Sequence, residues 1–571
     1  MSLLRLCWQR DAAEDDGDFD DGDEAEDDDE QQDVCSTWTW RMLNDTDVHN
    51  VPDVASTCSE AETITASLPQ NPTPFEYLRL YFSDEIVDAI VVETNRYADQ
   101  YITRNVIPPH SSVRNWVPTS RDEMLSFLGL CLLMGLVYKP RLSMYWSGDE
   151  IYRTPVFGQV MARDRFLLIL RFLHCNDNDA TDVRNPDRDR LHKIRPVISM
   201  LRSNCASVCQ PGRDLCVDES LVLYKGRLAF KQFIRSKRAR FGIKMFELCT
   251  SNGILLDFIV YHGKTRAELL KITGHDFLFS EQIPLTLMEK YLDKGHRLFV
   301  DNYYTSTVLA QYLLDRGTKL VGTVRPTRRN FPPELANVQL NKGEMKYAAS
   351  HTGILAVKYR ATTDKSNNKP KVVHVLTTDH KNESSPTGKK DRDGTTIVKP
   401  KCVLDYNRHM GGVDLVDQQL ESVLAIRKTY KWYKKVLFRL FLQSALSAHK
   451  LHQSAAEVRP KQDFLKFLHD CVTVMIGKLP RLSATACAGF DSVARLTGRE
   501  HFPSKREYEG EGHKRSSKKK KCRVCTTRGL RSPKGGQVET TWVCEACPSI
   551  PGLCVEKGCF REYHTKLDYS K

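Results

Sequence analysis

Hydrophobic residues change their spacing twice along the chain. From residue 74, in PFEYLRLYFSDEIVDAIVVETNRYADQYI, to about residue 212, apolar residues recur every three or four positions, which predicts helices. From residue 213 the apolar runs shorten and predict strands, in DLCVDESLVLY, in TKLVGTVR and at the start of HRLFVDNYYTSTVLAQYLLDRG. KMFELCTSNGILLDFIVYHG predicts two strands joined by a turn at Asn252–Gly253. Helical spacing returns in VLDYNRHMGGVDLVDQQLESV and continues from residue 428 to about 480.

These changes of spacing, together with shifts in composition, divide the chain into eight segments. We predict a disordered, acidic tail (1–72), a helical segment (73–212), the first part of an α/β core (213–325), an interval with fewer regular signals (326–397), the second part of the core (398–421), a second helical segment (422–504), a basic linker (505–521) and a Cys-rich module (522–567).

One apolar stretch, MLSFLGLCLLMGLVY at residues 124–138, needs a separate explanation. It is about 15 residues long, whereas a helix that spans a membrane needs about 20. Thr119 or Ser120 before Asp122 and Glu123 is typical of a helix start. We therefore predict a buried helix here. The start of the chain shows no secretory signal, and the mean hydropathy of −0.44 favours a soluble protein.

Charge is distributed unevenly. Residues 11–30 hold 14 acids and no Lys or Arg, so a chain with a net charge of +12 carries +26 outside this run. A basic body suggests a polyanionic partner such as a nucleic acid. The acidic run is either a solvated tail alone or, in addition, a weak competitor for the basic surface.

Acidic residues lie where predicted strands and helices would place them rigidly. In LFVDNYYTS, Asp301 follows a buried strand, and it either caps the helix that starts near Thr305 or binds a metal ion. Asp218 lies on a strand, and Asp414 and Asp417 in GGVDLVD share one helix face. A strand, a hairpin, a second strand and a helix, with acids in this order, are typical of an RNase H-like nuclease core. Such acids hold two divalent cations for phosphoryl transfer.

Cysteines concentrate at the end of the chain. Of 18 cysteines, six lie between Cys522 and Cys559, and the scattered remainder favours a reducing compartment. The spacing predicts a zinc module rather than a disulfide framework, and the two CxxC pairs could form one ribbon-type site. The candidate ligands are Cys522, Cys525, Cys544, Cys547, Cys554, Cys559 and His564. An eighth ligand could be His513, Asp568 or water.

Basic residues near the predicted strands are candidate DNA contacts. They are Lys225, Arg227, Lys231, Lys237, Arg238, Arg240, Arg325, Lys434 and Lys435, with Trp432 for stacking on bases. The alternatives are a solvated loop face for the first group and a helix core with a basic rim for residues 427–439. KRSSKKKK at residues 514–521 predicts nuclear localisation or phosphate binding.

Several motifs resemble the piggyBac family of DNA transposases. VDESLVLYKGR, VDNYYTS and DYNRHMGGVDLVDQ are similar to the segments around that family's catalytic acids, and DRFLLILRFLHCND, LHKIRPVI, KRARFGIK and KWYKK match further blocks in the same order. The resemblance covers about residues 74–567. It implies a multidomain α/β protein: an RNase H-like catalytic core interrupted by an insertion domain (326–397), helical dimerisation and DNA-binding segments on either side, and a C-terminal zinc module.

The resemblance also implies a chemistry. Asp218, Asp301 and Asp414 would hold Mg²⁺ or Mn²⁺, with Asp417 as a fourth acid nearby. A homodimer in the nucleus would bind double-stranded DNA at transposon ends, excise through hairpin intermediates and integrate at TTAA targets. The zinc module would contain two interleaved sites, which need eight ligands.

Two other functions remain open from the sequence. The family includes domesticated relatives, so the chain could be a DNA-binding chromatin protein without transposition. It could also be a structure-selective nuclease or recombinase that uses the same core without integration.

Overall fold

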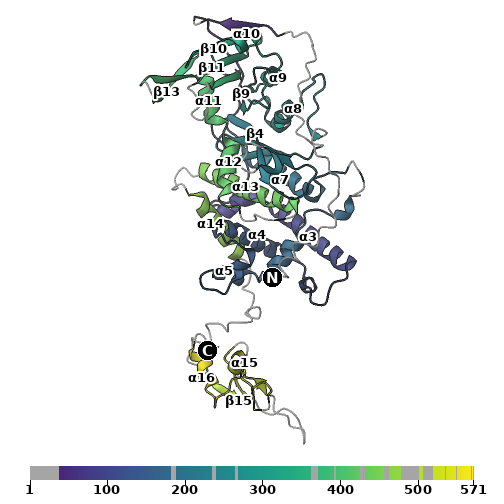
Figure 1. The fold of residues 1–571 in the computed structure, drawn as a ribbon. Helices are drawn as coiled ribbons and strands as arrows, with labels where there is room; N and C mark the ends of the chain where they lie inside the picture. Colours follow the sequence, from purple (N-terminus) through teal and green to yellow (C-terminus); the bar gives the residue numbers. More distant parts are fainter. Residues whose placement is uncertain are drawn as a thin grey trace. The chain divides into compact units, whose positions relative to one another are not determined.

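The computed structural model describes two stretches of the chain, with short gaps. These are residues 38–477, except 45, 182–184, 186–187, 235–239, 264–267, 362–370, 391–393, 425–428, 430 and 456–461, and residues 501–569, except 506–518, 534, 548–549 and 567–568. The chain forms two compact units, Met1–Leu479 and Pro480–Lys571 (Figure 1). The predicted acidic run, Lys237, Arg238, His513 and Asp568 lie outside the described residues.

The predicted helices of the first unit follow residue 73. They are α2 (Pro74–Tyr81), α3 (Asp84–Arg104), α4 (Arg121–Leu136), α5 (Pro155–Val160), α6 (Arg163–Phe172) and α7 (Arg195–Val208). Thr73 and Glu76 form a capping box at the start of α2. The prediction of helical structure from residue 74 is confirmed as far as Val208, and residues 209–210 form a short strand instead.

Helix α4 is the apolar stretch predicted to be a buried helix. Ser120 caps it by accepting a hydrogen bond from the backbone N–H of Glu123, and ten of its residues are buried. The helix packs against α14 (Phe464–Gly477), where the Ser126 hydroxyl donates to the Met475 carbonyl at 3.1 Å. The prediction is confirmed. Within the described part of the chain, none of the helices has the length and apolar character needed to cross a bilayer.

A single mixed sheet forms the centre of the first unit. Strand β4 (Asp214–Leu223) pairs antiparallel with β6 (Phe241–Thr250), which pairs antiparallel with β7 (Leu255–Val260). On its other side β4 runs parallel to β8 (Arg297–Val300), and β8 runs parallel to β9 (Lys319–Thr323). The predicted turn between β6 and β7 is confirmed, and Gly253 adopts φ +88°, where a side chain would be strained.

The sheet continues into residues 326–397. Strands β10 (Met345–Ser350), β11 (Leu355–Arg360) and β12 (Val372–Thr377) extend it beyond β9. Strands β13 (Ser384–Lys390) and β14 (Thr396–Pro400) form a separate two-stranded ribbon. The weak sequence signals of this interval therefore hide strands that belong to the central sheet.

The prediction that all of residues 1–72 are disordered is wrong for residues 38–72. Strand β1 (Trp40–Leu43) pairs antiparallel with β10 and adds one strand to the sheet edge. The indole N–H of Trp40 donates to the Asn330 carbonyl at 2.9 Å, and β2 (Thr63–Ile64) pairs with β3 (Cys209–Gln210). A segment of polar composition is ordered here because the partner strands complete its backbone hydrogen bonds.

Helices cover both faces of the sheet. Neighbouring residues of a strand point to opposite faces. Ser220 of β4 and Glu247 of β6 point toward α12 (Gly412–Glu421) and α13 (Trp432–Ser454), which lie beside β4 in Figure 1. On the opposite face Phe246 contacts Phe279 of α8 (Phe279–Met288). Two further helices, α9 (Thr307–Asp315) and α11 (Lys401–His409), follow β8 and β14.

The second unit is the Cys-rich module. It contains α15 (Arg523–Thr527), α16 (Cys559–Thr565), and two ribbons in which β15 (Pro503–Lys505) pairs with β18 (Trp542–Cys544) and β16 (Lys520–Lys521) pairs with β17 (Glu539–Thr540). Residues 501–505, predicted to end the second helical segment and start a linker, are therefore part of this module.

Candidate metal centres and nucleic-acid interface

Strand pairing brings two of the predicted acids together. Val217 of β4 is the partner of Val300 of β8, both fully buried, and the next residues are Asp218 and Asp301. Carboxylate oxygens of Asp218, Glu219 and Asp301 lie within 4.8 Å of one another. We call these three residues the acid cluster.

Asp301 carries a perturbed charge. Burial, and then the neighbouring charge of Glu219, raise the pKa of Asp301 to about 6. The backbone N–H of Tyr303, which donates to Oδ1 at 3.0 Å, and the charge of Lys244 act in the opposite direction. A bound cation would stabilise the ionised form of a carboxylate that is largely buried beside other carboxylates.

The sequence left two roles for Asp301, a helix cap or a metal ligand, and the structure assigns the cap to another residue. Ser306, not Asp301, caps α9, since its hydroxyl accepts from the backbone N–H of Leu309 at 3.0 Å. The Asp301 carboxylate instead accepts hydrogen bonds from the backbone N–H groups of Tyr303, at 3.0 Å, and Tyr304, in the tight turn that joins β8 to the helix. The strand therefore also presents the Asp301 carboxylate to Asp218 and Glu219.

Asp414 approaches the same region from α12. Its charge, with those of Asp301 and Asp218, raises the pKa of the Tyr406 phenol, although burial is the largest cause. α12 lies close to the sheet because Gly412 has no side chain: a Cβ there would be 2.4 Å from the Thr250 carbonyl oxygen. Asp414 is thus near the acid cluster without being one of the three residues whose oxygens converge.

Asp417 has a different environment. Its Oδ1 accepts a hydrogen bond from Nη2 of Arg439 at 2.6 Å, and Arg439 also lies 3.7 Å from the fully buried Glu247. The structure therefore groups Asp417 with the Arg439–Glu247 ion pair and not with the three residues of the acid cluster. Glu219 takes a place in the cluster that the sequence interpretation had not assigned. The adjacent acids in VDES were the available signal.

The acid cluster suits Mg²⁺ or Mn²⁺ by its donor chemistry. Three carboxylates supply hard oxygen donors and an excess of negative charge, and the neighbouring Tyr304 hydroxyl is buried, with no hydrogen-bond partner among the described residues. The same burial and the charges of Glu219, Asp218 and Asp301 raise the pKa of Tyr304 far above its usual range, so its hydroxyl stays protonated.

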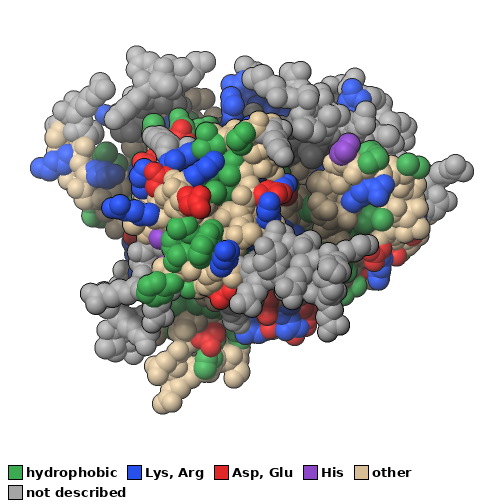
Figure 2. Space-filling view, turned by 90° about the horizontal axis from the view of Figure 1, so that it is seen from below, with side chains coloured by type: hydrophobic (Ala, Val, Ile, Leu, Met, Phe, Trp, Pro, Cys, Tyr) green, Lys and Arg blue, Asp and Glu red, His purple; other side chains and the backbone are tan. Residues whose placement is uncertain are grey.

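The predicted DNA contacts fall into two groups. Lys225, Arg227, Arg240 and Arg325 are exposed, and Lys231 and Lys435 are half-buried. Figure 2 shows Lys and Arg side chains interspersed with acidic and apolar ones on the face it displays.

Trp432 and Lys434 are buried, which does not favour contact with DNA. Trp432 packs edge-on against Phe230, with ring centroids 5.2 Å apart. Nζ of Lys434 donates to the carbonyls of Leu170 and Arg171, at 2.6 and 3.0 Å. The alternative interpretation of this stretch, a helix core with a basic rim, describes these two residues better.

The Cys-rich module brings its ligands into two clusters of four. One consists of Cys522, Cys525, Cys554 and Cys559, and the other of His501, Cys544, Cys547 and His564. In each, one ligand atom per residue lies within 4.8 Å of the others. Four soft or borderline donors in a compact group are the ligand set of structural zinc, and the module binds zinc. The two CxxC pairs belong to different clusters, so the single ribbon-type site is excluded.

The second cluster contains the missing eighth ligand, His501. Its Nδ1 lies 3.4 Å from Sγ of Cys544 and 3.6 Å from Sγ of Cys547. Nδ1 of His564 is 2.8 Å from the Phe560 carbonyl, which directs its Nε2 toward Cys547. His501 precedes the first cysteine by 21 residues, so the spacing within the cysteine run could not reveal it.

Comparison with known proteins agrees with this architecture. A family model described as Transposase IS4 matches residues 73–448, and one described as a DDE_Tnp_1-like zinc finger matches residues 508–565. The chain belongs to this family of transposase-like proteins. Within it, the chain is a member of the piggyBac group, as its motifs suggested.

The chain is similar to human proteins and to one solved structure. PiggyBac transposable element-derived protein 3 of Homo sapiens is 28% identical over 86% of this chain and 76% of the relative. PiggyBac transposable element-derived protein 2 of Homo sapiens is 24% identical over 93% and 81%. The cryo-EM structure of a piggyBac transposase synaptic complex with hairpin DNA is 21% identical, with a TM-score of 0.61 over 85% of this chain and 96% of that one. This likeness establishes a shared mixed α/β fold.

Proposed function

We propose that this chain is a metal-dependent cut-and-paste DNA transposase. The observation that carries the proposal is the convergence of Asp218, Glu219 and Asp301 on adjacent parallel strands. The sheet supports it: β4 has antiparallel β6 and β7 on one side and parallel β8 and β9 on the other, the arrangement of an RNase H-like core.

In this proposal the acids form the catalytic centre. Asp218, Asp301 and Asp414, with Glu219, would hold Mg²⁺ or Mn²⁺. When bound, such ions would activate the attacking oxygen and stabilise the charge on the leaving oxygen. The strands keep Asp218 and Asp301 at a defined separation, and burial keeps water around them scarce. Lys244, whose Nζ lies 5.0 Å from the centre of the Tyr303 ring, provides a cation beside Asp301.

The proposed reaction proceeds on DNA. Water cuts one strand at the transposon end, and the freed 3′-OH attacks the opposite strand to form a hairpin, which is then opened. The exposed 3′-OH groups then attack a TTAA target. Lys225, Arg227, Lys231 and Arg240, which follow Asp218 along the chain, are the residues we propose to hold phosphates near the cut.

The other proposed properties follow from the same function. The zinc module, with its basic segment, binds the transposon ends, and the protein acts as a homodimer in the nucleus. The second candidate function is a DNA-binding protein that no longer transposes. The names of its human relatives, which describe proteins derived from transposable elements, support this second function.

A two-plasmid excision assay with Mg²⁺ and matched transposon ends tests the proposal. Wild type and Asp315→Asn, a control at an exposed acid of α9, should excise. Asp301→Asn should not excise but should still bind the ends. Excision by Asp301→Asn at the wild-type rate would overturn the catalytic assignment. End binding without excision by wild type would favour the alternative function.

A further inference from the structure

Helix α12, which carries Asp414, is attached to the sheet by a buried arginine. Nη2 of Arg439, on α13, donates to Oδ1 of Asp417 at 2.6 Å, and it lies 3.5 Å from the Ser220 hydroxyl of β4. Arg439 is 8% exposed and Asp417 is 28% exposed. Asp417 is three residues beyond Asp414, so this bond sets the rotation of the helix that presents Asp414.

The same arginine is connected to the acid cluster by the pairing of β4 with β6. Its second acidic neighbour, Glu247, is the direct partner of Asp218 in the β4–β6 pair. The Ser220 hydroxyl and the Gln443 amide donate to Glu247 at 2.8 and 2.6 Å, so the carboxylate is well supported although it is fully buried. Arg439 therefore joins α12 to the strand residue opposite Asp218.

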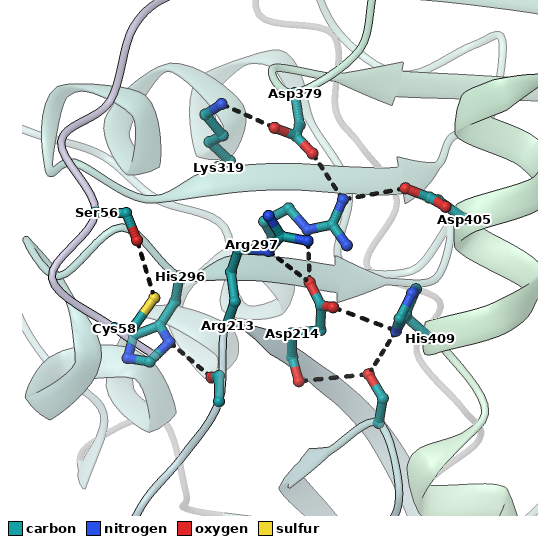
Figure 3. Close-up of polar contacts among 12 residues, drawn as sticks. Ser56, Cys58, Arg213, Asp214, His296, Arg297, Lys319, Asp379, Asp405 and His409 are labelled. Carbon is teal, nitrogen blue, oxygen red and sulfur yellow. Dashed lines mark hydrogen bonds and ion pairs between the residues drawn. The ribbon is translucent and has the colours of Figure 1, made fainter. Parts of the chain in front are cut away.

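A second buried arginine holds the other end of the same segment (Figure 3). Nη1 of Arg297, in the first position of β8, donates at 3.0 Å to Asp405 of α11, the helix just before α12. It also donates at 2.9 Å to Asp379, while its Nε donates at 2.5 Å to Asp214 of β4. Figure 3 shows these carboxylates gathered around the Arg297 guanidinium.

Buried ion pairs of this kind add little to stability in comparison with apolar packing, and in some proteins their role is to fix one geometry. Besides the two arginines, the segment α11–α12 is held by apolar packing and by contacts of His380 with Asp405 at 3.1 Å and of His409 with the Ser251 hydroxyl at 3.0 Å. Metal ligands need placement to a fraction of an ångström, and groups that orient ligands commonly change metal affinity about 10- to 100-fold. The two arginines act at the two ends of the segment that contains Asp414.

We propose that Arg439 and Arg297 are positioning residues, a two-arginine clamp that sets Asp414 against the acid cluster. In this assignment Asp417 is the anchor of α12 and not a metal ligand. The inference rests on the proposed metal-dependent function, so its test measures metal binding directly.

The test is Mn²⁺ titration of the zinc-loaded full chain, with free Mn²⁺ followed by its paramagnetic resonance signal. Asp417→Asn and Arg439→Lys should each weaken Mn²⁺ binding by about 10-fold while the melting temperature stays close to wild type. Asp405→Asn should act in the same direction through α11. The matched controls are Asp293→Asn and Arg316→Lys, an exposed pair with the same 2.6 Å separation, which should leave Mn²⁺ binding unchanged.

Two further comparisons separate positioning from general loss of structure. Arg439→Gln leaves Glu247 without its cation, so it is combined with Glu247→Gln to remove both buried charges. Positioning predicts that Arg439→Lys retains more Mn²⁺ affinity than this double variant. The same order should hold for cleavage at saturating Mn²⁺.

The outcomes are distinct. If Asp301→Asn and Asp414→Asn weaken Mn²⁺ binding but Asp417→Asn, Arg439→Lys and Asp405→Asn do not, the clamp is wrong and the proposed function stands. If Asp417→Asn abolishes binding as fully as Asp301→Asn, Asp417 is a ligand and the anchor assignment fails. If wild type binds no Mn²⁺ that depends on Asp301, the proposed function itself fails.

Discussion

Asp218 and Asp301 lie side by side because the residues before them, Val217 and Val300, are partners in a parallel strand pair. The buried strands leave the two carboxylates little freedom to separate, and Glu219 adds a third charge. Without a bound cation these negative charges repel one another. The stability of the metal-free protein therefore tests this arrangement.

Asp301→Asn should make the metal-free chain more stable at pH 8. The pKa of Asp301 is raised from 3.8 to about 6 in the folded chain, so the ionised group destabilises the fold above pH 6. This cost fades as the pH falls through 6 and is absent below about pH 4. Urea unfolding of zinc-loaded protein without Mg²⁺ should show a gain of about 2–3 kcal/mol at pH 8 and almost none at pH 4.

Asp315→Asn is the control for that comparison, since Asp315 is exposed. Its stability should follow wild type at both pH values. Equal stability of Asp301→Asn and wild type at pH 8 would contradict the electrostatic strain described for the acid cluster.

Glu219→Gln should weaken divalent-cation binding and cleavage by at least about 10-fold. Its carboxylate lies within 4.8 Å of the other two, and Gln keeps its shape but removes its charge. The measurement is the Mg²⁺ dependence of DNA strand cleavage, with Glu421→Gln of α12 as an exposed control. Unchanged Mg²⁺ dependence in Glu219→Gln would show that Glu219 has no part in the site.

His501→Ala should reduce the zinc content from two ions per chain to one. His501 supplies one of four ligands in the second cluster, and a three-ligand site loses its closed coordination. Atomic emission on dialysed protein provides the count. His469→Ala, at a histidine 62% exposed and in the other unit, should keep both ions. Two retained zinc ions in His501→Ala would mean that another group completes the site.

Arg297→Met should destabilise the first unit by about 3–5 kcal/mol, because it removes the cation shared by Asp214, Asp379 and Asp405. Arg316→Met removes an exposed arginine paired with Asp293 and should cost less than about 1 kcal/mol. Urea unfolding at pH 7 measures both. A similar small loss for the two variants would indicate that the Arg297 network is solvated rather than buried.

Local patterns predicted those elements whose signals lie within one short segment. The buried α4, the turn at Asn252–Gly253 and the strand that ends just before Asp301 all follow from neighbouring residues. β1 was missed because a four-residue strand in a polar tail is stable only beside β10, which lies some 300 residues away. His501 was missed for the same reason, since its partners come from the far end of the module.

Burial also separated residues that look alike in sequence. Lys434 and Lys435 are adjacent in KWYKK, yet Lys434 donates to two backbone carbonyls in the core whereas Lys435 is half-buried. Asp414 and Asp417 share a helix face in sequence, but Asp417 meets Arg439 whereas the charge of Asp414 acts on Tyr406. Helical spacing determines which face a residue occupies, and the neighbouring elements determine what that face contacts.

The amino-acid sequence by itself determined the family, the order of the helices and of the core strands around the acids, and the residue types for a cation centre and a zinc module, because these depend on local spacing and on motifs. The tertiary structure decided which acids converge, which arginines hold α11 and α12, and which histidine completes the second zinc cluster. Those relationships depend on strand register and on packing between distant segments, and no local spacing records them.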